Sequence, residues 1–475
     1  MADDRGRSDL IISGGGSTQV APDSFLSAER ALAALSGRLT DLADELSPVL
    51  TLSSSPDAVR LAHKALGDLQ DAATESAALS RDLATAAERY GAAERAANSY
   101  LIGVSEVGGW MIGRLAPVAL AGVLPALPAL LMLAAGGFAS GSAVSGGSST
   151  FLGQLGALAS KNAGLLRDPR AVALVRQVVS STDDAMLGAA GVPLPLARLA
   201  DDRRTGAFGL HGAARAVTVG ASMFGMLRET PVRVERTAVT PVEPPSTYSE
   251  LAQRIPPASA AEPQVRVERY AGPDGSPDRY IVYVGGTVDT SPVASDEPFD
   301  VTGDLAGVAG LDAGSARATE LALQQAGAQP GDTVIPVGYS QGGIVATGIA
   351  TSGEYTVPAL VTFGSPTGGI DVPSGTVDVA VEHTDDIIPA LGGDPREFGD
   401  GGGDRILVRR QTYSGAVPLD SSPIAGHQFA EYQKTADEMD LSTDARLASA
   451  LGALPAGVPG EAGLYRGIRE ARQAG

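Results

Sequence analysis

The first regular pattern of apolar and polar positions lies in residues 25–46. Its apolar residues recur every three or four positions, at Phe25, Ala28, Leu32, Leu35, Leu39, Leu42 and Leu46. This spacing places them on one face and predicts a helix. A second stripe follows Ser55 and Pro56, residue types typical of a helix N-cap and first turn. Its apolar members are Val59, Ala62, Leu66, Leu69, Ala73, Leu83, Ala87 and Tyr90.

Two helices that each carry one narrow apolar stripe are expected to pair as an antiparallel hairpin. Such a pair would still expose apolar surface. We therefore expect the hairpin to bind a helical partner, to form a homodimer or to pack on later helices.

The most hydrophobic part of the chain lies between Arg114 and Lys161, where no side chain is formally charged. Its densest stretch, 115–138, is long enough to span a bilayer. Three prolines inside this stretch would interrupt a membrane helix. A buried, proline-bent helical segment and a membrane contact through 115–138 both remain open. Further helical patterning, without recognisable chemistry, continues over 161–227.

A change of pattern near residue 240 indicates a new domain. Prolines are frequent in 231–263, which predicts a linker or a wrapping arm. Beyond it, short β-rich runs alternate with helical patterns and predict an α/β domain with a mainly parallel sheet. The expected strands are 264–270, 280–284, 333–337, 359–363, 376–381 and 406–408, and the expected helices are 315–326 and 341–351. The expected divisions are a helical hairpin at 1–100, a hydrophobic and helical connecting region at 101–240, the α/β domain at 241–455 and a C-terminal tail at 456–475.

Composition narrows the possible functions. The 475 residues suffice for about three domains. With 35 Lys and Arg against 55 Asp and Glu, the net charge is −20, which disfavours nucleic acid as a partner. The absence of cysteine excludes disulfides, thiolate metal sites and a cysteine nucleophile. The first ten residues contain no apolar stretch of signal-peptide length, so we expect no Sec signal.

The sharpest motif is Gly338-Tyr339-Ser340-Gln341-Gly342, which fits G-x-S-x-G. A predicted strand precedes it and a predicted helix follows it, and this strand, turn and helix form the context of a nucleophile elbow. A serine in such a strained turn needs neighbours without Cβ atoms, so that helix and strand can approach closely. We therefore expect Ser340 to be a nucleophile flanked by Gly338 and Gly342.

A serine nucleophile needs a base, and the base needs an acid that orients it. His427 is the only histidine after the predicted strand 376–381 and its acidic loop. That loop contains Asp385 and Asp386, either of which can be the acid. His383 is expected to be a loop or supporting residue, and we expect no role in catalysis for the two other histidines, His63 and His211.

The order Ser340, Asp386, His427 around the G-Y-S-Q-G motif resembles the α/β-hydrolase superfamily, in particular cutinases and the esterase domains of PE-PPE proteins. The loop His383-Thr384-Asp385-Asp386-Ile387-Ile388-Pro389 is similar to the catalytic-acid loop of class 3 lipases. This resemblance favours Asp386 as the acid. It also implies an oxyanion hole formed by Gln341 and Thr287. The lack of disulfides departs from secreted cutinases.

The resemblance implies a serine esterase or lipase that forms a covalent acyl-enzyme on lipid or acyl esters and needs no cofactor. The same groups also serve thioesterases, peptidases and acyltransferases. A Gly-rich stretch at 392–404 is typical of a flexible flap beside such a site. The spacing of its aspartates does not fit the helix-loop-helix calcium template, and no metal site is expected.

The N-terminal hairpin with Tyr90 and Glu94 resembles WXG-type substrates of type VII secretion, which carry a Y-x-x-x-D/E signal. It departs from them because Trp110 lies outside the hairpin and no W-x-G turn joins the helices. This resemblance implies a secreted or cell-envelope protein exported by a non-Sec route, with a cytoplasmic location as the alternative. The alternative function is a membrane-interacting or exported effector or interaction protein whose hydrolase fold is inactive or secondary.

Overall fold

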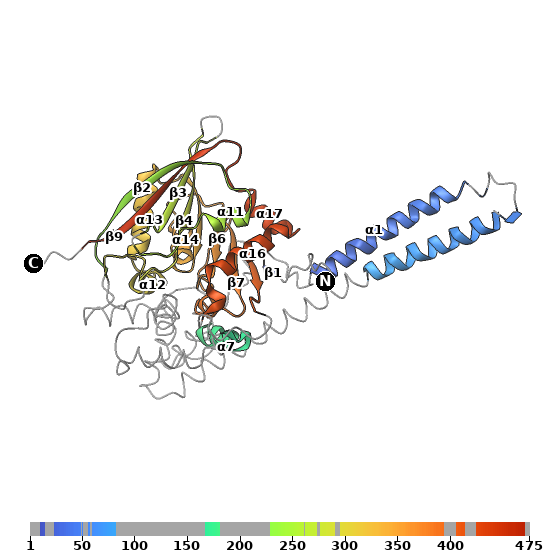
Figure 1. Ribbon diagram of the computed structural model, residues 1–475, viewed down its shortest axis with the longest axis horizontal. Helices are drawn as coiled ribbons and strands as arrows, with labels where there is room; N and C mark the ends of the chain where they lie inside the picture. Colours follow the sequence, from blue (N-terminus) through green and yellow to red (C-terminus); the bar gives the residue numbers. More distant parts are fainter. Residues whose placement is uncertain are drawn as a thin grey trace, which may run out of the picture. The chain divides into compact units, whose positions relative to one another are not determined.

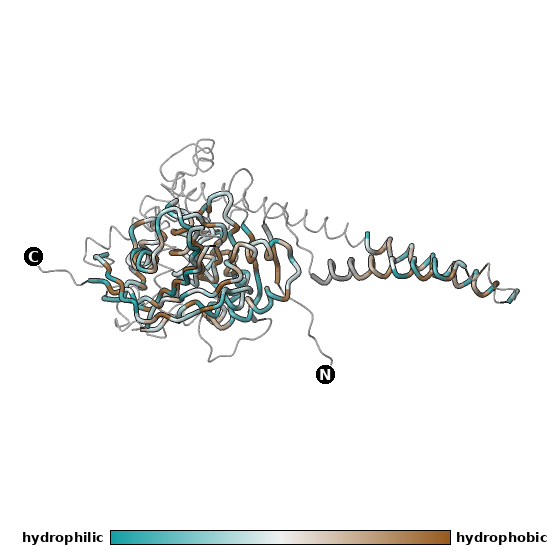
Figure 2. Tube along the Cα trace, turned by 90° about the horizontal axis from the view of Figure 1, so that it is seen from above, coloured by the Kyte–Doolittle hydropathy of each residue, from teal (hydrophilic) through white to brown (hydrophobic). Residues whose placement is uncertain are grey.

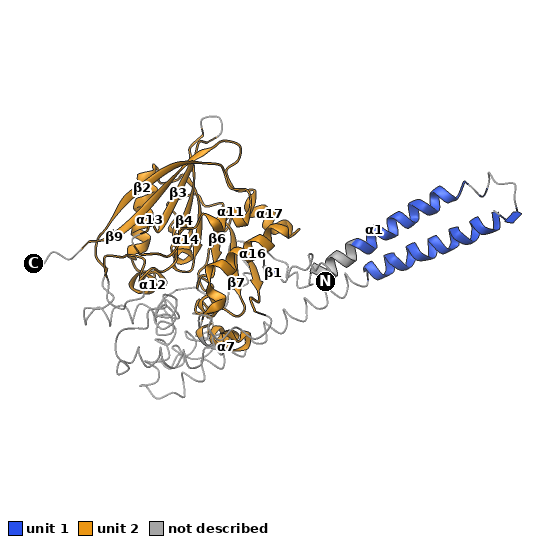
Figure 3. Ribbon diagram, in the orientation of Figure 1, with its two compact units in different colours: residues 1–13, 17–100 blue, residues 14–16, 101–475 orange. Residues whose placement is uncertain are grey.

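The computed structural model describes residues 10–14, 23–48, 50, 56–57, 59–81, 167–180, 229–260, 262–272, 276–289, 295–393, 405–413 and 424–470. The chain divides into two compact units (Figure 3). The first comprises residues 1–13 and 17–100, and the second comprises residues 14–16 and 101–475.

The first unit contains α1 (Asp23–Leu46) and a second helix over 59–81. Both predicted helices are thus confirmed within the described residues. The Ser36 hydroxyl donates a hydrogen bond to the Ala73 carbonyl, 2.9 Å away, and links the two helices. Hydrophobic and hydrophilic positions alternate along both (Figure 2). Leu42 and Leu61 remain 51% and 65% exposed, so helix pairing covers only part of the apolar surface. A partner for this surface stays a prediction.

Several sequence predictions fall outside the described residues. These are the signal-like pair Tyr90 and Glu94, Trp110, and the hydrophobic stretch 115–138. No helix in the described part of the chain is both long enough and apolar enough to cross a membrane.

The second unit has a mixed α/β fold built on a sheet in which strands β2 to β9 lie in the order β8-β7-β6-β5-β4-β3-β9-β2 (Figure 1). These strands are β2 (Val232–Val242), β3 (Val265–Tyr270), β4 (Arg279–Val284), β5 (Thr333–Tyr339), β6 (Ala359–Phe363), β7 (Val377–His383), β8 (Arg405–Arg410) and β9 (Gly460–Arg469). A short strand, β1 (Ile11–Gly14), lies near the start of the described residues. Neighbouring strands from β4 to β8 pair in parallel, whereas β3 with β4, β3 with β9 and β2 with β9 pair antiparallel. The sheet is therefore mixed, and the sequence prediction did not anticipate its antiparallel part.

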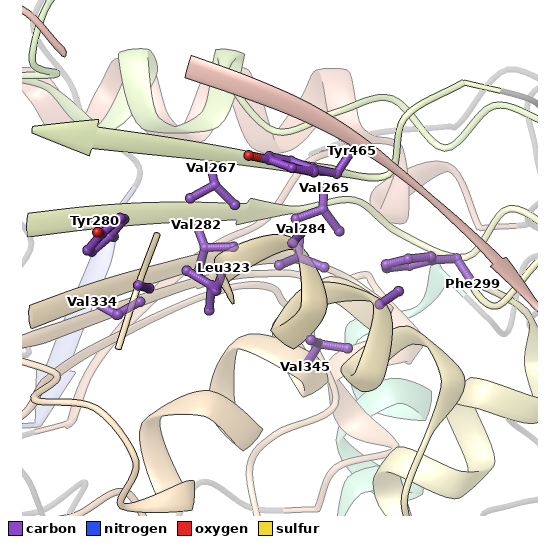
Figure 4. Close-up of a cluster of buried hydrophobic side chains, with 13 residues drawn as sticks. Val265, Val267, Tyr280, Val282, Val284, Phe299, Leu323, Val334, Val345 and Tyr465 are labelled. Carbon is purple, nitrogen blue, oxygen red and sulfur yellow. The ribbon is translucent and has the colours of Figure 1, made fainter. Parts of the chain in front are cut away.

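Helices connect and cover these strands. They are α7 (Pro169–Ser180), α11 (Tyr248–Gln253), α12 (Val301–Val308), α13 (Gly314–Ala326), α14 (Gln341–Ser352), α15 (Ile387–Ala390), the short 3₁₀ helix η3 (Ala425–His427), α16 (Phe429–Leu441) and α17 (Ala445–Leu451). In β4, all residues from Tyr280 to Val284 are buried, as expected for a strand covered on both faces. Its valines meet Leu323 of α13 and Val345 of α14 in the main core (Figure 4).

Two predicted boundaries need correction. The proline-rich region expected to be a linker contains β2 and α11. Pro241 is tolerated because β2 is the last strand of the sheet, where one side needs no hydrogen-bond donor. The expected tail 456–475 contains β9, which lies between β3 and β2. Glycine and charged residues in β9 hide its strand pattern in the sequence.

Candidate active site

Ser340 occupies the sharp turn between β5 and α14. Its φ of 53° and ψ of −119° make it the one non-glycine residue with positive φ among the described residues. The turn depends on glycine neighbours. A Cβ added at Gly338 would lie 2.2 Å from the Gly342 carbonyl oxygen, and one added at Gly342 would lie 2.1 Å from the Val284 carbonyl oxygen. The close approach expected from the motif is therefore present, and Ser340 has the strained backbone of a functional turn.

The structure brings Ser340, His427 and Asp386 into one hydrogen-bonded chain. The Ser340 Oγ lies 2.9 Å from Nε2 of His427, and Nδ1 of His427 lies 2.7 Å from Oδ2 of Asp386. Asp386 and His427 are buried, at 1% and 4% exposed. These residues come from the β5–α14 turn, the N-cap of α15 and η3, which are far apart in the sequence.

Backbone and side-chain donors fix the Asp386 carboxylate. The amide of Ile388 donates to Oδ1 at 2.9 Å, and the Tyr432 hydroxyl donates to Oδ2 at 2.7 Å. Burial, together with the nearby Asp386 charge, raises the pKa of Tyr432 well above its usual value. Tyr432 therefore stays protonated and remains a donor. The sequence analysis did not identify it, since a tyrosine inside a helical pattern carries no distinguishing signal.

His427 is held from its other side by Tyr339. The Tyr339 hydroxyl donates to the backbone carbonyl of His427, and the two rings stack with centroids 5.2 Å apart. Burial and the Asp386 charge raise the pKa of Tyr339 well above its usual value. The residue before the serine in the motif thus positions the imidazole that faces that serine.

The two neighbouring aspartates have different surroundings. Asp385 accepts hydrogen bonds from the amides of Thr412 and Tyr413, at 3.0 and 2.9 Å, whereas Asp386 contacts His427. The arrangement therefore favours Asp386 as the orienting acid, as the sequence resemblance does.

His383 is a buried supporting residue. Its Nδ1 lies 2.7 Å from the Gly426 carbonyl oxygen, and its ring stacks on Tyr432 at 3.8 Å. A carbonyl oxygen only accepts, so Nδ1 carries the proton. Burial lowers the pKa of His383, and the imidazole is therefore neutral. It connects the backbone next to His427 with the tyrosine that donates to Asp386.

Thr287 lies in the loop after β4, one residue after Gly286. A Cβ added at its neighbour Gly286 would be 3.4 Å from Cβ of Ser340. The Thr287 hydroxyl is bonded to Oδ2 of Asp304 at 3.0 Å. Burial, opposed by this hydrogen bond and reinforced by the Asp300 charge, raises the pKa of Asp304 from 3.8 to about 8. At neutral pH Asp304 is thus mostly a neutral acid beside Thr287, a contact that the sequence did not reveal.

The side chain of Gln341 points to α12. Its Nε2 donates to the Asp300 carbonyl at 3.0 Å, and its buried Oε1 has no hydrogen-bond partner. Asp300 caps α12 through the Gly303 amide and pairs with Arg469 of β9. The antiparallel end of the sheet is thereby connected to the turn that carries Ser340.

An aliphatic cluster borders the reactive groups. Its members are Val172, Val308, Ala309, Ile344, Ile387, Ile388, Ala390, Leu391 and Ile424. Ile344 lies one turn after Ser340, and Ile387 and Ile388 directly follow Asp386. Val172 belongs to α7, which the sequence analysis placed outside the α/β domain. The site therefore combines a hydroxyl, an imidazole and a carboxylate with apolar surroundings.

Among the described residues, no group of three or more histidine, aspartate or glutamate residues is placed to hold a metal ion. Comparison of the chain with known protein families, curated proteins and solved structures found no match.

Proposed function

We propose that this protein is a serine hydrolase of the α/β-hydrolase type that cleaves carboxylic esters through a covalent acyl-enzyme. The observation that carries the proposal is the continuous hydrogen-bonded chain from Ser340 through His427 to Asp386. A serine hydroxyl needs such a base to become a nucleophile, and the base needs an acid that fixes its orientation.

In the acylation step, the Ser340 Oγ attacks the carbonyl carbon of the ester while His427 Nε2 takes the hydroxyl proton. The carboxylate of Asp386 stabilises the imidazolium that forms. The tetrahedral intermediate then breaks its bond to the alcohol oxygen, and His427 returns the proton to the leaving alcohol. The acyl group remains on Ser340.

The negative charge of the tetrahedral intermediate needs donors that are already in place. Gln341 is the first residue of α14, so its backbone N–H is one of those that a helix leaves without an intrahelical partner, and it serves as one donor to the oxyanion. The Thr287 hydroxyl is the second donor. It donates to Oδ2 of Asp304 in this structure, and it turns from that carboxyl group to the oxyanion as the negative charge develops.

In deacylation, water takes the place of the alcohol. His427 removes a proton from the water as its oxygen attacks the acyl carbon, and the bond to Ser340 Oγ breaks. The proton passes through His427 to Ser340, and the carboxylic acid leaves. The protein's own side-chain and backbone groups carry out all of these steps, so the proposal includes no cofactor.

The aliphatic cluster supports an acyl or lipid ester as the substrate. Ile344 lies one helical turn after Ser340, and Ile387 and Ile388 directly follow Asp386. Burial of an acyl chain in such surroundings removes apolar surface from water and favours binding by about 0.8 kcal/mol per CH₂. A charged or peptide-like substrate would not gain this binding free energy.

The test uses the full chain and the variants Ser340→Ala and Ser352→Ala. Ser352 lies at the exposed end of the same helix and serves as the matched control. We expect fluorophosphonate labelling and hydrolysis of p-nitrophenyl esters by the wild type and by Ser352→Ala. The Ser340→Ala variant should not label, and its kcat should fall by at least about 1,000-fold. A folded wild-type protein that neither labels nor turns over would contradict the proposal.

Export by a non-Sec route depends on residues 90 and 94, which lie outside the described residues, and it stays a prediction.

A further inference from the structure

Helix α7 (Figure 1) lies upstream of the α/β region in the sequence but packs against α15, the helix that follows Asp386. Its buried residues, Val172, Arg176 and Val179, recur at helical spacing and are 2%, 8% and 4% exposed. Leu174, on another face of α7, is 61% exposed. One face of α7 is therefore buried, and a charged residue lies at the centre of that face.

Arg176 binds two positions that are close in space and eleven residues apart in the sequence. Its Nη2 donates to Oε2 of Glu382 at 2.8 Å, and its Nη1 donates to the carbonyl of Gly393 at 3.2 Å. Glu382 immediately precedes the segment 383–392, and Gly393 immediately follows it. This segment carries His383, Asp386 and all of α15.

The ion pair is buried, with the Arg176 and Glu382 side chains 10% and 4% exposed. Burial alone would raise the pKa of Glu382, but Arg176 and Arg409 outweigh it and lower that pKa. The carboxylate is therefore charged and held by a planar guanidinium with fixed donor directions. Such a contact restrains position more strongly than an exposed pair would.

We propose that Arg176 is a positioning residue: it clamps the two ends of the segment 383–392, keeps Asp386 in line with His427, and makes α7 part of the catalytic unit. The catalytic part of this inference rests on the proposed function. The clamp itself can be tested without activity.

The geometry explains why the segment needs a clamp. Asp386 must stay 2.7 Å from His427 Nδ1, yet the segment that carries it is a loop ending in a single helical turn. A short helix has little stability of its own. Arg176 fixes both ends of the segment from outside the sheet, while Tyr432 fixes its middle.

The test compares Arg176→Met, Arg176→Lys and Arg170→Met in the full chain. Arg170 is an exposed residue of the same helix and provides the matched control. The double variant Arg176→Met/Glu382→Gln removes both charges, and it is measured in place of Arg176→Met if that variant folds poorly. The first measurement is amide hydrogen exchange of peptides covering 383–393 and 341–352.

We expect Arg176→Met to accelerate exchange in 383–393 by at least about 10-fold, because the segment opens locally, and to leave 341–352 unchanged. Arg170→Met should match the wild type. Unchanged exchange in 383–393, or equal acceleration in both peptides, would overturn the clamp. This readout holds whether or not the protein hydrolyses esters.

The second measurement is steady-state hydrolysis, with kcat and KM determined separately. Misplacement of Asp386 should lower kcat by about 10- to 100-fold with little change in KM. Arg176→Lys should recover part of the rate. A rate loss that follows only the unfolded fraction, with no recovery in Arg176→Lys, would assign Arg176 a merely structural role and overturn the proposal.

Discussion

Replacing Asp304 by asparagine should remove a specific part of the pH dependence of stability. The pKa of Asp304 is about 8 in the folded protein, whereas its ordinary value is 3.8. Between these two values the folded state keeps a proton that the unfolded state has lost. Each pH unit in this window therefore lowers the free energy of unfolding by about 1.4 kcal/mol, and stability falls as pH rises. Below the window the contribution is constant.

Asparagine has the shape of the neutral acid but does not titrate. The stability of Asp304→Asn relative to the wild type should therefore rise by roughly 3 kcal/mol between pH 5 and pH 7. This difference is measured by urea unfolding at several pH values. The near-ultraviolet circular dichroism of the buried tyrosines of the second unit monitors the unfolding. Glu297, whose pKa is raised to about 7, titrates in both proteins and therefore cancels in the comparison. A difference that stays constant across this range would refute the reasoning.

Three further predictions concern the residues around Ser340. Asp386→Asn should lower kcat by about 10,000-fold, because His427 loses the partner that fixes its tautomer. Asp385→Asn should keep its activity and lose about 1–3 kcal/mol of stability, measured by urea unfolding. Tyr432→Phe should lower kcat/KM by about 10-fold through loss of one hydrogen bond to a charged group, measured by ester hydrolysis, and wild-type kinetics would contradict this role. Gly342→Ala should abolish soluble expression or lower the melting temperature strongly, because its Cβ would overlap the Val284 carbonyl, and an unchanged melting temperature would contradict the packing of the turn.

Local patterns were sufficient to predict the central strands and the positions of the reactive residues. The apolar runs that became β4 to β8 are buried and short, and the glycine-flanked serine follows β5 as expected. Ser340 could be selected from its motif, and His427 because it is the only histidine after the acidic loop, whereas the choice of Asp386 over Asp385 came from the resemblance to the acid loop of class 3 lipases. Their catalytic roles stay predictions.

The sequence did not predict contacts between distant segments. Val172 and Arg176 belong to an ordinary amphipathic helix, and nothing in their spacing indicates that they dock beside Asp386. Strand β9 is rich in glycine and charged residues, and it is stabilised by pairing with two strands that lie more than 180 residues upstream. The raised pKa of Asp304 arises from burial, which depends on the whole fold.

The position of β9 has a consequence for biosynthesis. Thr230, just before β2, bonds to Glu470, just after β9, across 240 residues of chain. Of the described elements, β9 is the last to leave the ribosome, yet it must insert between two strands made much earlier. Until then, β3 has an unpaired edge, β2 has no neighbour in the sheet, and a nascent chain in this state is prone to aggregation. Arg469 reaches Asp300 only at this step, so the contacts that support the serine turn are completed only after the other strands of the second unit have been synthesised.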